Sequence, residues 1–215
     1  MKIPLPPLDI QQKIVDEIEK VEKREDEVKV GIEKWKDSIK NLFLIKSGKT
    51  HRLDEICELK AGKFVKADDI KTKFENGLYP CYGGNGLRGY TKTFTNEGKY
   101  SLIGRQGALC GNVHVVSGKF HATEHALVVY PNESIDETWF SYQLIHMNLN
   151  QYATGTAQPG LSVINLNPIQ IIVPPLSEQQ RIVTEIEKIE TEIACLETEL
   201  ASIPAGKEAI LKKYL

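Results

Sequence analysis

The same twenty-residue phrase occurs twice in this chain, at residues 3–22 and again 168 positions later at residues 171–190. Thirteen of the twenty paired positions are identical, and pairs such as Lys13 with Arg181 are conservative exchanges. Self-similarity at one long interval indicates a structural unit that is used twice. The stretch between the copies differs in composition, so we expect a separate domain there, bordered by two like elements.

Each copy of the phrase predicts the start of a long helix. A Pro-Pro pair opens both copies, and because proline cannot join a helix interior, the helix must begin after it. Asp9 and Ser177 stand where an N-cap residue is expected, with Gln12 and Gln180 three positions later. That spacing is typical of a capping box, in which the two side chains satisfy free backbone N–H groups.

Apolar residues after both helix starts are spaced alternately four and three positions apart. A 3.5-residue repeat held this long predicts a narrow apolar seam and a left-handed coiled coil. Only Glu25 interrupts it in the first copy. The seam positions are Ile14, Ile18, Val21, Val28, Ile32, Trp35, Ile39 and Leu42 in the first helix and Ile182, Ile186, Ile189, Ile193, Leu196, Leu200 and Ile203 in the second.

We expect the two helices to lie antiparallel, the first from about Ile10 to Lys46, roughly 55 Å long at 1.5 Å per residue. Pro204 and Gly206 predict a break in the second helix, with a short helix over Lys207–Leu215. The alternative is a pair of ordinary core helices in a compact bundle. The expected borders of the three parts are 1–48, 49–176 and 177–215.

The middle part is expected to be irregular, which makes the fold class α+β overall. Short strands separated by glycine-rich turns are predicted at Lys99–Ile103, Val113–Val116 and Ala126–Tyr130. A helix is predicted at about Ile135–Asn148, with Ser134 and Glu137 as its capping box.

Two short motifs in the middle part match catalytic sequence patterns. Each pattern is meaningful only if the secondary structure around it is the one that the site requires. Gly84–Gly89 fits G-x-G-x-x-G, but a strand-like segment follows it instead of the helix that a dinucleotide site requires, so we interpret it as a turn. His121, Glu124 and His125 fit the zinc motif H-x-x-E-H, which requires a helix. Strand-like residues follow this motif too, so a zinc-dependent hydrolase is kept only as an alternative.

The loops of the middle part carry the side chains that read nucleic acid. The chain has a net charge of −2, but residues 58–105 have a local excess of basic residues, nine Lys or Arg against five Asp or Glu. Arginine suits guanine edges, asparagine and glutamine suit adenine edges, and lysine suits phosphates. The candidate DNA-binding residues are Lys63, Tyr82, Asn85, Arg88, Arg105, Gln106, Thr156 and Gln158. The alternative interpretation is that these side chains are ordinary polar residues of surface loops without a binding role.

Composition places the chain among soluble globular proteins, at 41% hydrophobic and 26% charged residues. No apolar run approaches the roughly 18 residues of a membrane span, and no signal peptide is visible. The four cysteines form no CxxC pair. We therefore expect a cytoplasmic protein with reduced thiols.

Several segments resemble type I restriction–modification specificity subunits. They are Pro174-Pro-Leu with the Ser-Glu-Gln-Gln-Arg-Ile-Val run after it, Ile103–Ala108, Thr154–Ser162 and Lys207–Leu215. The resemblance implies a target recognition domain at 49–176 between two spacer helices. It also implies a DNA-reading subunit without a catalytic site or cofactor, whose helices dock methyltransferase subunits that bind S-adenosylmethionine and methylate adenine.

Family members usually carry two recognition domains and read a bipartite site, which restriction subunits then act on. This chain resembles a half-length form with one domain, so a homodimer is one expectation for how a full site is read. A protein that occupies methyltransferase subunits without reading DNA is a further alternative.

Overall fold

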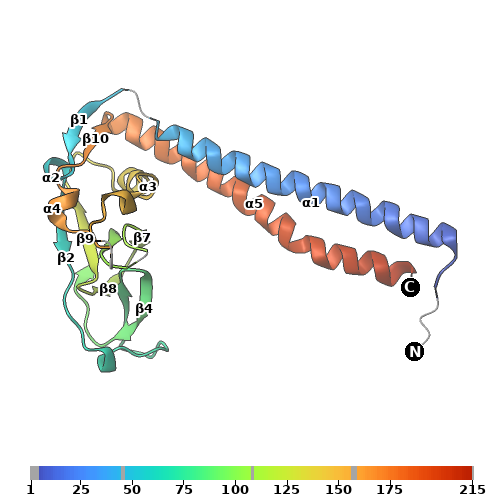
Figure 1. The fold of residues 1–215 in the computed structure, drawn as a ribbon, viewed down its shortest axis with the longest axis horizontal. Helices are drawn as coiled ribbons and strands as arrows, with labels where there is room; N and C mark the ends of the chain where they lie inside the picture. The colour runs from blue at the N-terminus through green and yellow to red at the C-terminus, as the bar shows by residue number, and fades with distance from the viewer. Residues whose placement is uncertain (1–4, 45–46, 108, 156–158, 215) are drawn as a thin grey trace. The chain divides into compact units, whose positions relative to one another are not determined.

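The computed structural model describes residues 5–44, 47–107, 109–155 and 159–214 (Figure 1). The chain divides into two compact units, one made of Met1–Leu44 with Thr184–Leu215 and the other of Ile45–Val183. We call the first the helical pair and the second the β-rich domain. No helix among the described residues is long and apolar enough to cross a membrane.

Two long helices, α1 (Leu8–Leu42) and α5 (Leu176–Tyr214), dominate the chain. Both begin directly after a Pro-Pro pair, where the carbonyl of Pro7 accepts from the N–H groups of residues 10 and 11, and the carbonyl of Pro175 from those of residues 178 and 179. Asp9 and Ser177 therefore lie inside the first turn, and the predicted capping boxes are wrong. The proline carbonyls already satisfy the N–H groups that a cap would have taken.

A different glutamine secures each helix start. The side-chain Nε2 of Gln11 donates to the Pro6 carbonyl at 2.8 Å, and that of Gln179 donates to the Pro174 carbonyl at 2.9 Å. The two glutamines are 168 positions apart, as are the two prolines, so both copies of the phrase build the same local structure. Gln12, the residue predicted for the first capping box, instead donates to Asp16.

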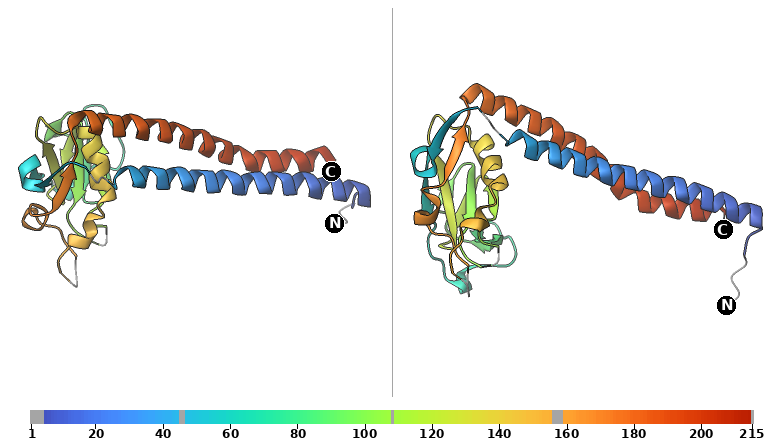
Figure 2. Two further views of the ribbon diagram at one scale, coloured as in Figure 1. Left: turned by 90° about the horizontal axis from the view of Figure 1, so that it is seen from above. Right: turned by 45° about the horizontal axis from the view of Figure 1, so that its top comes forward.

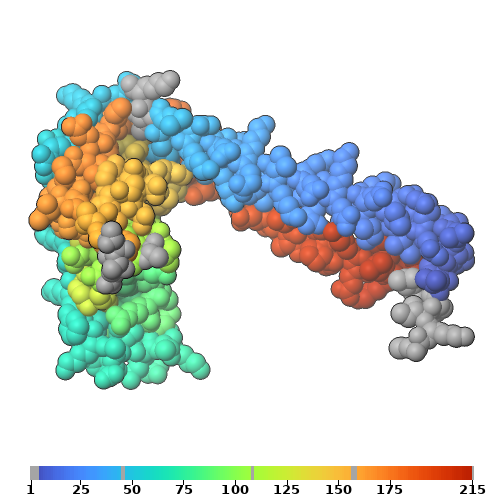
Figure 3. Space-filling view, in the orientation of Figure 1, coloured from blue at the N-terminus to red at the C-terminus, as the bar shows by residue number. Residues whose placement is uncertain are grey.

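α1 and α5 run antiparallel in the helical pair (Figure 2). Lys213 near the end of α5 contacts Glu17 near the start of α1 at 2.8 Å, while Glu199 contacts Arg24 further along, at 2.6 Å. The C-terminal part of α5 lies against α1 (Figure 3). The predicted antiparallel coiled coil is confirmed.

Burial follows the 4-3 spacing in both helices. Val28, Ile32, Ile39, Ile182, Ile186, Ile189 and Ile203 are buried, while Ile14, Ile18, Val21, Leu42, Ile193, Leu196 and Leu200 are partly buried. Trp35 is the most exposed of the predicted seam residues, at 37%, and is covered only in part. A seam between two helices is too narrow to enclose so large a side chain.

The predicted break at Pro204 is also wrong, because α5 continues through that residue to Tyr214. The 4-3 burial continues beyond it, with Lys207, Ile210 and Tyr214 partly buried. Lys207 reaches Glu25, the one polar residue of the α1 seam, at 2.8 Å. The helix is thus continuous although a proline inside a helix costs about 3 kcal/mol.

The β-rich domain contains three sheets. The first pairs β1 (Lys49–Arg52) with β10 (Gln170–Val173). The second has the order β2 (Cys57–Ala61), β9 (Ala126–Pro131), β6 (Tyr100–Gly104), β7 (Val113–Val116) and is antiparallel. The third has the order β4 (Gly86–Thr91), β3 (Tyr79–Gly83), β8 (Lys119–Ala122), β5 (Asn96–Glu97), with β3 and β8 parallel.

The second and third sheets share a core in which Phe120 and Ala122 of β8 join Leu102 of β6 and Val128 of β9. Short helices complete the domain: α2 (Leu53–Ile56), α3 (Glu137–His146), α4 (Val163–Leu166) and the 3-10 turns Ala67–Asp69 and Leu149–Tyr152. The three predicted strands and the predicted helix are confirmed in position, as is the α+β class.

The N-cap of α3 differs from the prediction. Asp136 caps it by accepting from the backbone N–H groups of Thr138 and Trp139, at 3.0 and 2.9 Å. Ser134, the predicted cap, lies two residues before it. Asp136 is itself held from outside the helix, because its backbone N–H donates to the side chain of Gln179 at 2.8 Å.

Candidate nucleic-acid interface

Three backbone segments meet beside the turn of the β3–β4 hairpin. They are the turn itself, the loop after β6 and the residues that follow β8. The Arg105 N–H donates to the His125 carbonyl at 2.9 Å, and the Thr123 N–H donates to the Tyr82 carbonyl at the same distance. These bonds join segments that are about 20 to 40 residues apart in the sequence.

Glycine permits this close approach. A Cβ atom at Gly104 would collide with the carbonyl oxygen of Gly84, and a Cβ at Gly84 would lie 2.9 Å from the His125 carbonyl. Gly84 belongs to the G-x-G-x-x-G match, which the structure places at the tip of a hairpin. The interpretation of that motif as a turn is confirmed.

A hollow of about 400 Å³ opens where these segments meet. Its lining consists of Gly83, Gly84, Asn85, Gly86, Leu87, Arg88, Gln106, Gly107 and His125. Asn85, Arg88 and Gln106 were predicted as DNA-binding residues, and all three are exposed. The structure therefore brings three predicted side chains to one surface, although the loops that carry them are separate in the sequence.

His125 and Leu87 line the same hollow and were not predicted as DNA-binding residues. His125 falls within the H-x-x-E-H match, where it was considered only as a zinc ligand. Its Nε2 lies 3.2 Å from Glu124 Oε1, and its side chain is 42% exposed. Leu87 carried no signal, because an apolar residue in a strand-like segment is first assigned to a core.

Arg105 is turned into the domain. Its Nη1 donates to the Glu124 carbonyl at 2.9 Å, and its Nε is buried with no hydrogen-bond partner among the described residues. Its carbonyl accepts from the Leu161 N–H at 2.7 Å. This position favours a role in ordering the loops around the hollow, and direct contact of Arg105 with bases stays a prediction.

The remaining candidates are dispersed. Tyr82 is partly buried, with its ring edge-on to Phe120 at 6.0 Å, and burial raises the pKa of its hydroxyl. Lys63 is exposed, and its backbone N–H donates to Ala122 at 2.8 Å. Thr156 and Gln158 lie outside the described residues.

The H-x-x-E-H segment does not have the geometry of a zinc peptidase. His121 is a buried residue of β8, and its ring nitrogens lie 3.0 Å from Thr93 Oγ1 and 3.1 Å from the Lys63 carbonyl. The following residues form a turn, so the two histidines are not one helical turn apart on a common face. No group of three metal-ligating side chains is found within the described ranges.

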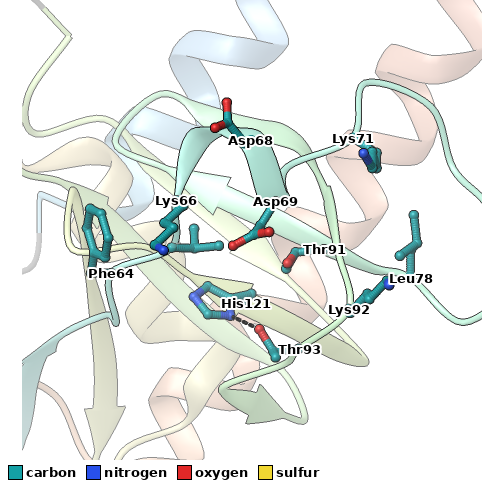
Figure 4. Close-up of a pocket in the computed structure, with 11 residues that line it drawn as sticks. Phe64, Lys66, Asp68, Asp69, Lys71, Leu78, Thr91, Lys92, Thr93 and His121 are labelled. Atoms are coloured by element: carbon teal, nitrogen blue, oxygen red, sulfur yellow. Dashed lines mark hydrogen bonds between the residues drawn. The ribbon is translucent and has the colours of Figure 1, made fainter.

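A second hollow, of about 460 Å³, lies on the same domain near the β3–β4 hairpin (Figure 4). Three lysines and two aspartates line it, together with Phe64 and the ring of His121 held by Thr93. The charged residues are Lys66, Lys71, Lys92, Asp68 and Asp69. The two aspartates make this hollow less suited to an anionic ligand. The lining of the first hollow contains an arginine and two amide side chains but no aspartate.

Comparison with known proteins connects this architecture to one family. A sequence model of the type I restriction–modification DNA specificity domain matches residues 46–205. The chain is 48% identical over 133 residues to the specificity subunit of the Escherichia coli type I restriction enzyme EcoprrI, which covers 61% of this chain and 33% of that protein. A putative type I specificity subunit of Haemophilus influenzae is 32% identical over 111 residues, or 50% of this chain and 29% of that protein.

Solved structures share the fold. The HsdS subunit of Thermoanaerobacter tengcongensis gives a TM-score of 0.65 at 21% identity, covering 99% of this chain and 59% of that one. The type I S subunit of M. genitalium gives 0.64 at 19% identity, covering 97% and 61%. The chain thus spans about a third of the length of the curated relatives and about three fifths of these structures.

Proposed function

Because this chain belongs to the type I restriction–modification DNA specificity family, we propose that its β-rich domain recognises a DNA sequence for such a system. The observation that supports this most directly is the hollow that gathers Asn85, Arg88 and Gln106. Amide side chains pair with adenine edges and arginine pairs with guanine edges in the major groove. The three residues are exposed, and glycines around them let the backbone approach the DNA.

The domain performs no chemistry of its own in this proposal. Methyltransferase subunits dock on the helical pair, bind S-adenosylmethionine and methylate adenine within the site that the β-rich domain selects. Restriction subunits act on the same complex. A single recognition domain reads one part of a bipartite site, and a second copy of the chain supplies the other part.

Co-expression of the chain with a cognate methyltransferase subunit, followed by mapping of methylated sites in genomic DNA, tests the proposal. The wild-type chain should direct methylation to one sequence. Arg88→Ala and Asn85→Ala should each relax the sequence at one base pair, since a bidentate contact contributes about 1–3 kcal/mol of discrimination. Gln170→Ala is the control, because Gln170 is an exposed residue of β10 outside the hollow.

The outcomes separate this function from its rivals. A chain that only occupies methyltransferase subunits would direct no sequence preference, and Arg88→Ala would leave DNA affinity unchanged. Zinc bound in one equivalent, and lost on mutation of His121 and His125, would favour the hydrolase. Either result would overturn DNA recognition as the function of this domain.

A further inference from the structure

The tip of the β3–β4 hairpin departs from regular strand pairing. Cys81 pairs with Gly89, but the next residue of β3, Tyr82, pairs with Leu87, so Arg88 is an extra residue in β4. This is the arrangement of a β-bulge, which redirects side chains. Successive residues of a regular strand point to opposite faces. Here Leu87 and Arg88 are both exposed.

The backbone is fixed on both sides of these two residues. Gly89 has a φ of +153°, and a Cβ atom there would collide with the Lys71 carbonyl, which accepts from the Tyr90 N–H at 2.8 Å. On the other side, Gly86 has a φ of +89°, and a Cβ atom there would lie 3.1 Å from the His114 ring. Leu87 and Arg88 therefore project from a tip whose backbone is constrained on both sides, which favours specific binding.

An exposed leucine alone would carry no functional meaning, since apolar atoms contribute more than half of most protein surfaces. Leu87 differs from a random exposed residue because of its neighbours. It is 53% exposed and lines the hollow that also contains Asn85, Arg88 and Gln106. It is the one large apolar side chain in that described lining, and the surrounding groups are those that recognise base edges.

We propose that Leu87 is a specificity-determining residue that contacts the 5-methyl group of a thymine, next to a guanine read by Arg88. This inference rests on the proposed function. The major groove admits a two-stranded β-ribbon, and thymine is the base that presents a methyl group there. Because the bulge leaves both adjacent side chains exposed at one tip, Leu87 and Arg88 would reach neighbouring base pairs.

Deleting the methyl group from the DNA tests this contact without changing the protein. Once methylation mapping has given the recognised sequence, duplexes are made in which each thymine in turn is replaced by deoxyuridine. Affinity of the chain with its methyltransferase subunit is measured at one fixed salt concentration, because phosphate contacts make binding salt-dependent. At one thymine, adjacent to a guanine, binding should weaken about fourfold, the equivalent of one buried methyl group at about 0.8 kcal/mol.

Leu87→Ala closes the thermodynamic cycle. This variant should bind the thymine and deoxyuridine duplexes equally well at that position. Leu109→Ala is the matched control, because Leu109 is 48% exposed in the same domain but lies outside the hollow. It should retain the fourfold difference of the wild-type chain.

Three results would overturn the inference: a recognised sequence without a thymine beside a guanine, wild-type binding that ignores every deoxyuridine, or a Leu87→Ala variant that stays sensitive. Each of them leaves sequence-specific methylation intact, and so leaves the proposed function standing. Absence of site-specific methylation by the wild-type complex would instead reject the proposed function together with the inference.

Discussion

Replacing Gln179 with alanine should destabilise the β-rich domain by about 3 kcal/mol, although the same change at the repeat-equivalent Gln11 should cost less than about 1 kcal/mol. Both side chains donate to a proline carbonyl five residues earlier. Among the residues that the structure describes, only Gln179 also accepts a hydrogen bond, from the backbone N–H of Asp136 at 2.8 Å. The two glutamines therefore form a matched pair within one chain.

The magnitude follows from burial. Gln179 is 1% exposed, and its removal takes the hydrogen-bond partner away from the buried Pro174 carbonyl and from the partly buried Asp136 N–H. Each unsatisfied buried group costs about 1–3 kcal/mol. Gln11 is only partly buried, and water replaces its single bond at little cost.

Urea unfolding measures both effects. The chain has two tryptophans, Trp35 in α1 and Trp139 in α3. In a Trp35→Phe background, Trp139 alone reports on the β-rich domain, where it is fully buried. Equal costs for the two alanine variants, or a cost below about 0.5 kcal/mol at Gln179, would refute the argument that the second hydrogen bond fixes the domain.

Three further predictions follow from the same structure. Hydrogen bonds from Lys207 and Lys29 lower the pKa of Glu25 from its usual 4.5 to about 2, so the contribution of Glu25 to stability should be lost as the pH falls through that interval. Circular dichroism should show a smaller drop in unfolding midpoint between pH 5 and 2.5 for Glu25→Gln than for wild type, and equal drops would contradict this. Gly104→Ala should destabilise the β-rich domain by about 1–3 kcal/mol in the Trp139 assay, since its Cβ would collide with Gly84, and an unchanged midpoint would disprove the close approach. Gly206→Ala should stabilise α5 by about 0.5–1 kcal/mol, because a Cβ there meets no atom within 4 Å, and a lower thermal midpoint would indicate that the helix is broken after all.

The helical pair could be predicted in detail because its pattern is local. A 3.5-residue repeat identifies which face is apolar, and residues such as Val28 and Ile186 are buried as it requires. The predictions that were wrong for the helical pair, the capping boxes and the break at Pro204, depend on contacts that the repeat does not describe. Proline carbonyls replaced the capping side chains, and α5 continues through Pro204, beyond which Lys207 contacts Glu25 of α1.

Three strands of the β-rich domain, β6, β7 and β9, could be predicted from the sequence, but the assembly of the sheets could not. Nothing local indicates that β8 lies parallel to β3, or that β9 lies between β2 and β6. For the same reason, the directions of the side chains in the candidate site could not be predicted from the sequence. Arg88 and Arg105 stand in similar glycine-rich loops, yet Arg88 is exposed while Arg105 is turned inward onto Glu124, because pairings with distant segments set their directions.

The two copies of the repeated phrase form the same local hydrogen bond at the helix start, but they differ in their contacts with distant residues. The hydrogen bond from Gln11 or Gln179 needs only a carbonyl five residues earlier and a helix that starts between them, both of which the phrase itself encodes. The bond from Asp136 to Gln179 needs a partner 43 residues away and appears in one copy alone. Sequence identity between the copies therefore predicts the helix start, while the hydrogen bond between α5 and the residue that caps α3 depends on a residue outside the phrase. Exchanging Gln179 for glutamate separates the two roles, because a carboxylate still accepts from Asp136 but no longer donates to Pro174.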